Sequence, residues 1–212
     1  MKEKNLILDL GGVLIDLNYQ LTIQAFENLG SSNFKELYSQ ANQLGVFDSF
    51  ETGDISTQRF INEILKYLPN GCNPNQVVSA WNAMILDFKE SKIALLMQLK
   101  EIFNLFLLSN TNELHLIEVR NEWNKKRPFE FEKCFDKVYY SHLIGMRKPS
   151  VSVFQYVCSE NQLNPDQTLF IDDTIQHIQG AQKAGLKTLL HPQNKELNLD
   201  IILAQFDKNT MS

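Results

Sequence analysis

The chain has 212 residues, of which 43% are hydrophobic, which suits a globular protein of one domain or of one domain with an insertion. The formal net charge is −5, which argues against a nucleic-acid backbone as partner. The three cysteines lie far apart, as expected for reduced thiols rather than a disulfide framework or zinc site. No apolar run is long enough to span a membrane. We therefore expect a soluble, cytoplasmic protein that binds neither nucleic acid nor membrane.

Short apolar runs, each followed by polar or glycine-containing residues, predict five β-strands. Most are nearly continuous in Leu, Ile, Val and Phe, which is typical of strands buried on both faces of a parallel sheet. The predicted strands are Asn5–Leu10, Asn104–Ser109, Lys137–Ser141, Thr168–Asp172 and Lys187–His191.

Segments with helical spacing of apolar residues lie between most of these runs. They predict the helices Glu90–Phe103, Thr111–Trp123, Ser150–Glu160 and Asp173–Ala184. Gly185 follows the last of them, where glycine commonly ends a helix. Strands that alternate with helices predict an α/β fold with a doubly wound, Rossmann-like parallel sheet.

The connection between the first two predicted strands is much longer than one crossover needs. It contains four further segments with a helical pattern, Tyr19–Leu29, Phe34–Leu44, Thr57–Tyr67 and Pro74–Ile85. We predict that residues 16–87 form a helical cap inserted after the first strand into an α/β core made of residues 1–15 and 88–212. The alternative is one compact domain with extra helices.

Chemically useful side chains follow the predicted strands at their carboxyl ends. In a doubly wound sheet these ends lie along one edge, where ligands bind. The residues that meet there are Asp9, Ser109, Asn110, Lys148 and the pair Asp172-Asp173. A carboxylate can attack phosphorus and form an acyl phosphate, provided that cations offset the repulsion between the two anions. Hard Mg²⁺ prefers carboxylate and carbonyl oxygens, so the set predicts magnesium-dependent phosphoryl transfer.

Four segments in order resemble the signature motifs of the haloacid dehalogenase superfamily. They are DLGGVL at Asp9–Leu14, LLSNTN at Leu107–Asn112, GMRKP at Gly145–Pro149 and FIDDTIQHIQGAQKAG at Phe170–Gly185. The resemblance spans the chain and is greatest to the bacterial glucose-1-phosphate phosphatase branch. It implies a phosphatase that acts on a small phosphorylated metabolite, such as a sugar phosphate like glucose 1-phosphate, with Mg²⁺ as cofactor.

The resemblance also implies a role for each matching residue. The residues implied to bind magnesium are Asp9, which is also the nucleophile, the backbone carbonyl of Gly11, Asp173 directly, and Asp172 through water. The residues implied to bind the phosphoryl group are Ser109, Asn110 and Lys148, and Lys148 also neutralises Asp9. His177 stands where relatives often have Asn, and we interpret it as a local substitution.

One departure from the superfamily concerns proton transfer. Phosphatases of this superfamily usually have a second Asp where this chain has Gly11, and that Asp protonates the leaving group, a contribution typically worth about 10²–10⁴-fold. If nothing replaces it, substrates whose leaving group needs little protonation, such as anomeric sugar phosphates and acyl phosphates, are favoured. The candidate replacements are Asp16, Asp48 and Glu51.

Other functions and roles remain open at this point. A binding or regulatory protein with weak or no catalysis is compatible with Gly11, and carbon–halogen hydrolysis, as in 2-haloacid dehalogenases, is disfavoured by the late acid pair. The segment 47–54 either covers the site or is an interhelical loop. Arg147 is either structural or pairs with an acid, and His115 is expected to be solvated or to support the phosphate loop. The sequence does not indicate the oligomeric state.

Overall fold

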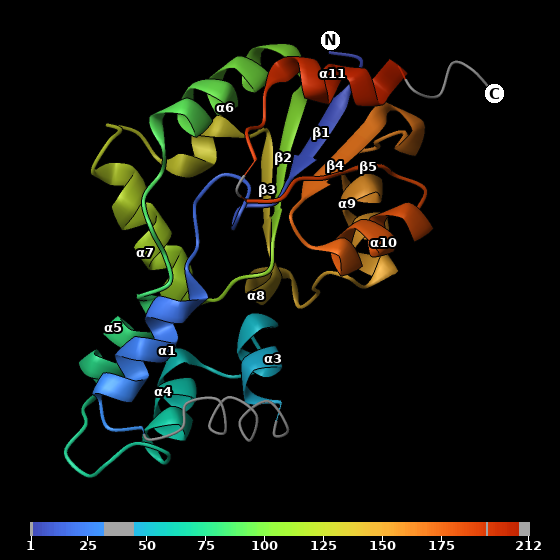
Figure 1. Ribbon diagram of the computed structural model, residues 1–212. Helices are drawn as coiled ribbons and strands as arrows, with labels where there is room; N and C mark the ends of the chain where they lie inside the picture. Colours follow the sequence, from blue (N-terminus) through green and yellow to red (C-terminus); the bar gives the residue numbers. More distant parts are fainter. Residues whose placement is uncertain (1, 32–44, 194, 208–212) are drawn as a thin grey trace.

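The computed structural model describes residues 2–31, 45–193 and 195–207, and the predicted helix Phe34–Leu44 lies outside the described residues. A sheet flanked by helices forms the upper part of Figure 1, and a group of helices from the first half of the chain lies below its lower end. This arrangement places the inserted helices beyond one end of the strands.

The sheet has five parallel strands in the order β3-β2-β1-β4-β5, which confirms the predicted doubly wound fold. The strands are β1 (Asn5–Leu8), β2 (Asn104–Ser109), β3 (Lys137–Tyr140), β4 (Thr168–Asp172) and β5 (Lys187–Leu190). In the central register Leu8 pairs with Leu107 on one side and with Ile171 on the other. The residues that follow β1, β2 and β4 therefore leave the sheet at one level.

Helices cover both faces of the sheet. One face is packed by α6 (Glu90–Ile102), α7 (Glu113–Asn124) and the unpredicted α11 (Leu199–Asp207), and the other by α9 (Val151–Glu160) and α10 (Ile175–Lys183). Successive strand residues point to opposite faces of the sheet. Leu6 and Leu8 pack against the helices α6, α7 and α11, whereas Ile7 packs against α9 and α10. Shorter elements are η1 (Phe131–Cys134), α8 (Ser141–Ile144) and η2 (Pro165–Gln167).

The inserted helices have a hydrophobic cluster of their own. They are α1 (Tyr19–Asn28), α3 (Val46–Glu51), α4 (Thr57–Leu65) and α5 (Pro74–Asn82), and most of their buried aromatic residues pack on one another. Leu114 of α7 also joins this cluster. The cap boundaries of 16 and 87 remain a prediction. No helix within the described ranges is long and apolar enough to cross a membrane.

Two connecting segments join the inserted helices to the sheet, and they run side by side. Leu17 and Ile85 form an antiparallel bridge, flanked by a hydrogen bond of 3.1 Å from the Leu86 N–H to the Asp16 carbonyl. The Asp16 carboxylate lies 2.7 Å from Lys92 Nζ and also pairs with Lys89. Burial alone would raise the pKa of Asp16, but the two ammonium groups outweigh it and lower that pKa. Asp16 is therefore a charged ion-pair partner at the entry to the cap.

Candidate active site

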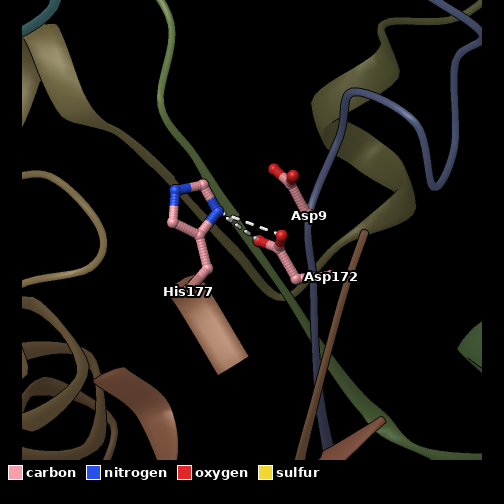
Figure 2. A group of neighbouring side chains, drawn as sticks. All are labelled: Asp9, Asp172 and His177. Carbon is pink, nitrogen blue, oxygen red and sulfur yellow. Dashed lines mark hydrogen bonds and ion pairs between the residues drawn. The ribbon is translucent and has the colours of Figure 1, made fainter. Parts of the chain in front are cut away.

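Three charged side chains meet at the carboxyl edge of the sheet. Asp9 follows β1, Asp172 ends β4, and Lys148 comes from the loop before α9. The Lys148 Nζ lies 2.7 Å from Asp9 Oδ1 and 2.7 Å from Asp172 Oδ2, with the lysine side chain fully buried. Figure 2 shows the carboxylates of Asp9 and Asp172 close together, beside the backbone segments that carry them. The structure thus brings together the predicted nucleophile, the predicted cation and one of the late acids.

The loop that carries Lys148 is fixed by Asn110, directly after β2. The Asn110 side-chain amide donates to the Lys148 carbonyl and its oxygen accepts from the Lys148 N–H, each at 2.9 Å. Paired side-chain to backbone bonds of this kind hold a loop in one position. The amide that we expected to contact phosphate therefore already has two partners, and it serves to place the lysine.

Burial and mutual charge make the two acids electrostatically unequal. Burial raises the pKa of Asp9 to about 7, and the nearby Asp172 adds to the rise, although Lys148 opposes both. Burial also disfavours the charged form of Asp172, but Lys148 and His177 outweigh it and lower its pKa to about 2. Burial acts against the charged lysine, yet the two carboxylates raise the pKa of Lys148. Asp172 and Lys148 therefore form the permanently charged pair.

His177 completes the surroundings of Asp172. Its Nδ1 lies 3.0 Å from each Asp172 carboxylate oxygen, as the dashed lines in Figure 2 show. The backbone N–H of Thr174 donates to Asp172 Oδ1 at 2.8 Å. With Lys148 on Oδ2, both oxygens of Asp172 are engaged by protein groups. His177, which we interpreted as a local substitution, therefore forms a hydrogen bond with the carboxylate of Asp172.

Asp173 lies beside the backbone that follows β1. Its Oδ1 accepts a hydrogen bond of 3.0 Å from the Thr174 hydroxyl. A Cβ on Gly12 would lie 2.0 Å from Asp173 Oδ2, and Gly12 has a φ of +75°. Only glycine combines this conformation with so close an approach. Burial raises the pKa of Asp173. Asp173 therefore needs Gly12 to reach the strand end that bears Asp9.

The donor set at this edge suits a hard cation. Asp9, Asp172 and His177 place potential ligand atoms within 4.8 Å of one another, and Asp173 adds a carboxylate beside Gly12. His177 and Asp172 are bonded to each other, so the carboxylates of Asp9 and Asp173 and nearby backbone carbonyls are the remaining donors. All of these donors are oxygens, the ligands that Mg²⁺ prefers. The residues fit a magnesium ion.

Gly11 provides no side chain at the position of the missing acid. A Cβ built there would lie 2.5 Å from Leu17 Cδ1, because the leucine side chain occupies the adjacent space. The path from Asp9 toward the inserted helices is therefore bordered by hydrocarbon at position 11.

A cleft of about 440 Å³ opens between the sheet edge and the inserted helices. Ser109 and Asn110 from the end of β2 lie on its wall, as does Gly11. Most of the other lining side chains are apolar, namely Leu10, Ile15, Leu17, Ile23, Trp81, Met84, Ile85 and Val119. Two of the three predicted phosphate-binding residues, Ser109 and Asn110, therefore border a largely hydrophobic space, whereas Lys148 is buried behind it.

The segment 47–54 proved to be mainly helical, as most of it lies in α3. Its acids pair with the core: Arg147 contacts Asp48 through Nη1 and lies 3.1 Å from Glu51 Oε2 through Nη2. Glu51 also lines the cleft, which identifies it as the cap acid closest in role to the missing one. From its aromatic and acidic composition we left open whether the segment covers the site or is an interhelical loop, and its pairing with Arg147 could not be derived from spacing.

Comparisons with known proteins agree with this geometry. A family model described as haloacid dehalogenase-like hydrolase matches residues 6–191. A D-ribitol-5-phosphate phosphatase of Bacteroides thetaiotaomicron is 26% identical over 196 residues, covering 90% of this chain and 92% of the relative.

Two solved structures extend the likeness to three dimensions. A HAD family enzyme from B. thetaiotaomicron, in complex with magnesium and inorganic phosphate, has a TM-score of 0.84 at 33% identity and covers 91% of this chain and 96% of its own. A HAD-like family hydrolase from Porphyromonas gingivalis has a TM-score of 0.84 at 27% identity, covering 99% and 100%. The four motifs, the sheet order and the family match agree: the chain belongs to the haloacid dehalogenase-like hydrolases.

Proposed function

We propose that this protein is a magnesium-dependent phosphatase that hydrolyses a small phosphorylated metabolite through an aspartyl phosphate on Asp9. The observation that carries the proposal is the buried Lys148 between Asp9 and Asp172, at the sheet edge where Ser109 opens into a cleft. A buried cation beside a carboxylate nucleophile is what the approach of two anions requires.

Each side chain of the site has a separate role in this reaction. Asp9 Oδ1 accepts from Lys148 and from the Leu10 N–H at 2.7 Å, and within the described residues Oδ2 accepts no hydrogen bond, so Oδ2 is the oxygen left for attack. The lysine and the Ser109 hydroxyl bind the phosphoryl oxygens. Asp9, Asp173 and the Gly11 carbonyl would hold magnesium, and Asp172 would support the ion without direct contact. When bound, Mg²⁺ neutralises charge on the phosphoryl group and the nucleophile.

The relatives support both the reaction and the ion. One similar protein is by its name a phosphatase of D-ribitol 5-phosphate, and one similar structure holds magnesium with inorganic phosphate. The late acid pair Asp172-Asp173 is the feature that favours this chemistry over carbon–halogen hydrolysis, which needs no metal.

The cleft limits the choice of substrate. Its volume of about 440 Å³ admits a metabolite of modest size, and its lining is mostly hydrocarbon. We infer that the alcohol released has an apolar face, which is a weaker fit for a fully hydroxylated sugar or polyol. A screen with Mg²⁺ that compares glucose 1-phosphate, D-ribitol 5-phosphate and alkyl or aryl phosphates by kcat/KM decides between these classes.

The activity itself is tested by hydrolysis of 4-nitrophenyl phosphate with Mg²⁺ and with a chelator. We expect turnover in the wild type, its loss on chelation and its loss in Asp9→Asn. The matched control Asp166→Asn makes the same chemical change at an exposed residue far along the chain in η2, and should keep full activity. Turnover that persists in Asp9→Asn would refute the proposed nucleophile. Binding of inorganic phosphate without turnover of any ester would instead favour the binding or regulatory alternative.

A further inference from the structure

Departure of an alkyl alcohol from phosphorus needs a proton, and the acids described at the sheet edge, Asp9, Asp172 and Asp173, already serve as nucleophile, ion-pair partner and metal ligand in the proposed function. Position 11 is glycine, and the Leu17 side chain occupies the space beside it. Lys148 is held as a charged ammonium between Asp9 and Asp172. A donor to the leaving group must therefore come from the opposite wall of the cleft.

Of the three candidate acids named from the sequence, Asp16, Asp48 and Glu51, two are unsuitable. Asp16 is charged and bound by Lys89 and Lys92 at the connecting segments. The Asp48 side chain is 65% exposed, forms an ion pair with Arg147 and does not line the cleft. Glu51 is the remaining acid, and it shares the cleft lining with Gly11 and Ser109.

The Glu51 carboxyl has the environment of a proton donor. Its side chain is 29% exposed overall, but Oε2 is buried and accepts no well-aligned hydrogen bond from the described residues. Arg147 Nη2 lies 3.1 Å from that oxygen, close enough for an ion pair although its N–H does not point along the line between them. A buried carboxyl oxygen without a directed donor gains little from being ionised.

Helix α3 is fixed in place, so the position of Glu51 is defined. Phe47 stacks on Trp81 with ring centroids 5.3 Å apart, and Phe50 stacks on Phe60 at 4.2 Å. After the helix, Gly53 lies so close to α8 that a Cβ there would be 2.2 Å from the His142 carbonyl oxygen. The cap core and the sheet edge therefore hold Glu51 from both sides.

We propose that Glu51 is the general acid and base that replaces the acid missing at position 11, an assignment that rests on the proposed phosphatase function. As Asp9 Oδ2 bonds to phosphorus and the bond from phosphorus to the ester oxygen breaks, the proton on the Glu51 carboxyl passes to that oxygen and the alcohol leaves. The Glu51 carboxylate then takes a proton from water. The water oxygen bonds to phosphorus, the bond to Asp9 breaks, and inorganic phosphate is released with Glu51 protonated again.

The charges around Glu51 agree with this assignment. Burial raises its pKa and Asp48 adds to the rise, while Arg147, His177 and Lys148 act in the opposite direction without cancelling it. A raised pKa increases the fraction of neutral acid near neutral pH, which is the form that donates. Arg147 then stabilises the carboxylate that remains after the proton has left.

The test compares wild type and Glu51→Gln with esters of different leaving groups, using kcat/KM with Mg²⁺, which reports steps up to departure of the alcohol. Glutamine keeps the shape but cannot transfer a proton. We expect kcat/KM to fall by about 10²–10⁴-fold for an alkyl phosphate. It should change little for 4-nitrophenyl phosphate, whose phenolate leaves unprotonated. The fall in wild-type kcat/KM toward alkaline pH with the alkyl ester should disappear in the variant.

The matched control is Asp54→Asn, the same charge removal at an exposed acid three residues further along. It should leave the ratio of the two kcat/KM values unchanged. Equal losses on both esters in Glu51→Gln, with an unaltered pH profile, would mean that Glu51 only holds Arg147 and would overturn its role as proton donor. A wild type without magnesium-dependent turnover of either ester would overturn the proposed function, and the role of Glu51 with it.

Discussion

The half-buried His115 makes the stability of this protein depend on pH in a defined window. Its Nε2 lies 3.2 Å from the Trp81 carbonyl and its Nδ1 lies 3.2 Å from the Asn112 side-chain nitrogen. A carbonyl only accepts and the amide nitrogen only donates, so the pair of contacts requires a neutral ring with its proton on Nε2. Burial lowers the pKa of His115 to about 4, although the bond to Trp81 opposes it. Of the two roles expected from the sequence, solvated or supporting the phosphate loop, the structure agrees with the second, because the neutral ring contacts Asn112 in the loop after β2.

The sign of the effect follows from proton binding. Between pH about 6.5 and about 4 the unfolded chain holds a proton on this ring and the folded chain does not, so stability falls as pH falls. A shift from 6.5 to about 4 corresponds to a loss of about 2 kcal/mol between pH ~7 and pH ~5. Because His115 lines the cleft, water there screens part of the effect, and we expect about 1–2 kcal/mol.

The assay is urea unfolding of wild type and His115→Gln at both pH values. The quantity compared is the change in unfolding free energy with pH, not its absolute value, because glutamine also alters packing. We expect the variant to lose less stability than the wild type on acidification, by about 1–2 kcal/mol. His142 and His191 remain in both proteins and cancel in the comparison. Equal pH dependence of the two proteins would refute the argument that His115 is buried in its neutral form.

Two further substitutions test the backbone that follows β1. Gly12→Ala forces a side chain into the left-handed region and against Asp173, so it should cost about 1–2 kcal/mol of stability and raise the Mg²⁺ concentration needed for half-maximal activity. An unchanged magnesium titration would contradict the placement of Asp173 as a ligand. Gly11→Asp in the Glu51→Gln protein meets only the end of the Leu17 side chain, which can rotate, so it should restore part of the lost alkyl phosphatase activity. No recovery in a folded double variant would show that position 11 does not face the leaving oxygen.

The sequence was informative wherever local pattern decides structure. The strands could be predicted because runs such as Thr168–Asp172 are apolar on both faces, and parallel strands align their carboxyl ends by necessity. That alignment predicted that Asp9, Lys148 and Asp172 would meet, and they do. It could not specify which oxygen of each acid is engaged, because that depends on the path of the loop carrying Lys148.

What the sequence left open depends on contacts between distant segments. The segment around Glu51 has only one and a half turns of helix and contains Asp and Ser, so local propensity does not distinguish a helix from a loop. Its conformation follows from the packing of Phe47 and Phe50 in the cap and from Arg147 in the core. Helix α11 was missed because it follows the last strand and no motif marks it.

The two segments that connect the inserted helices to the sheet are bonded to each other. Leu17 and Ile85 are bridged, and the Asn18 N–H donates to the Met84 carbonyl at 2.8 Å beside that bridge. A displacement of one segment alone would break these backbone hydrogen bonds. Leu17 lies both in this bridge and beside Gly11. The bonds that join the inserted helices to the sheet therefore also fix the side chain that packs against the backbone next to the nucleophile.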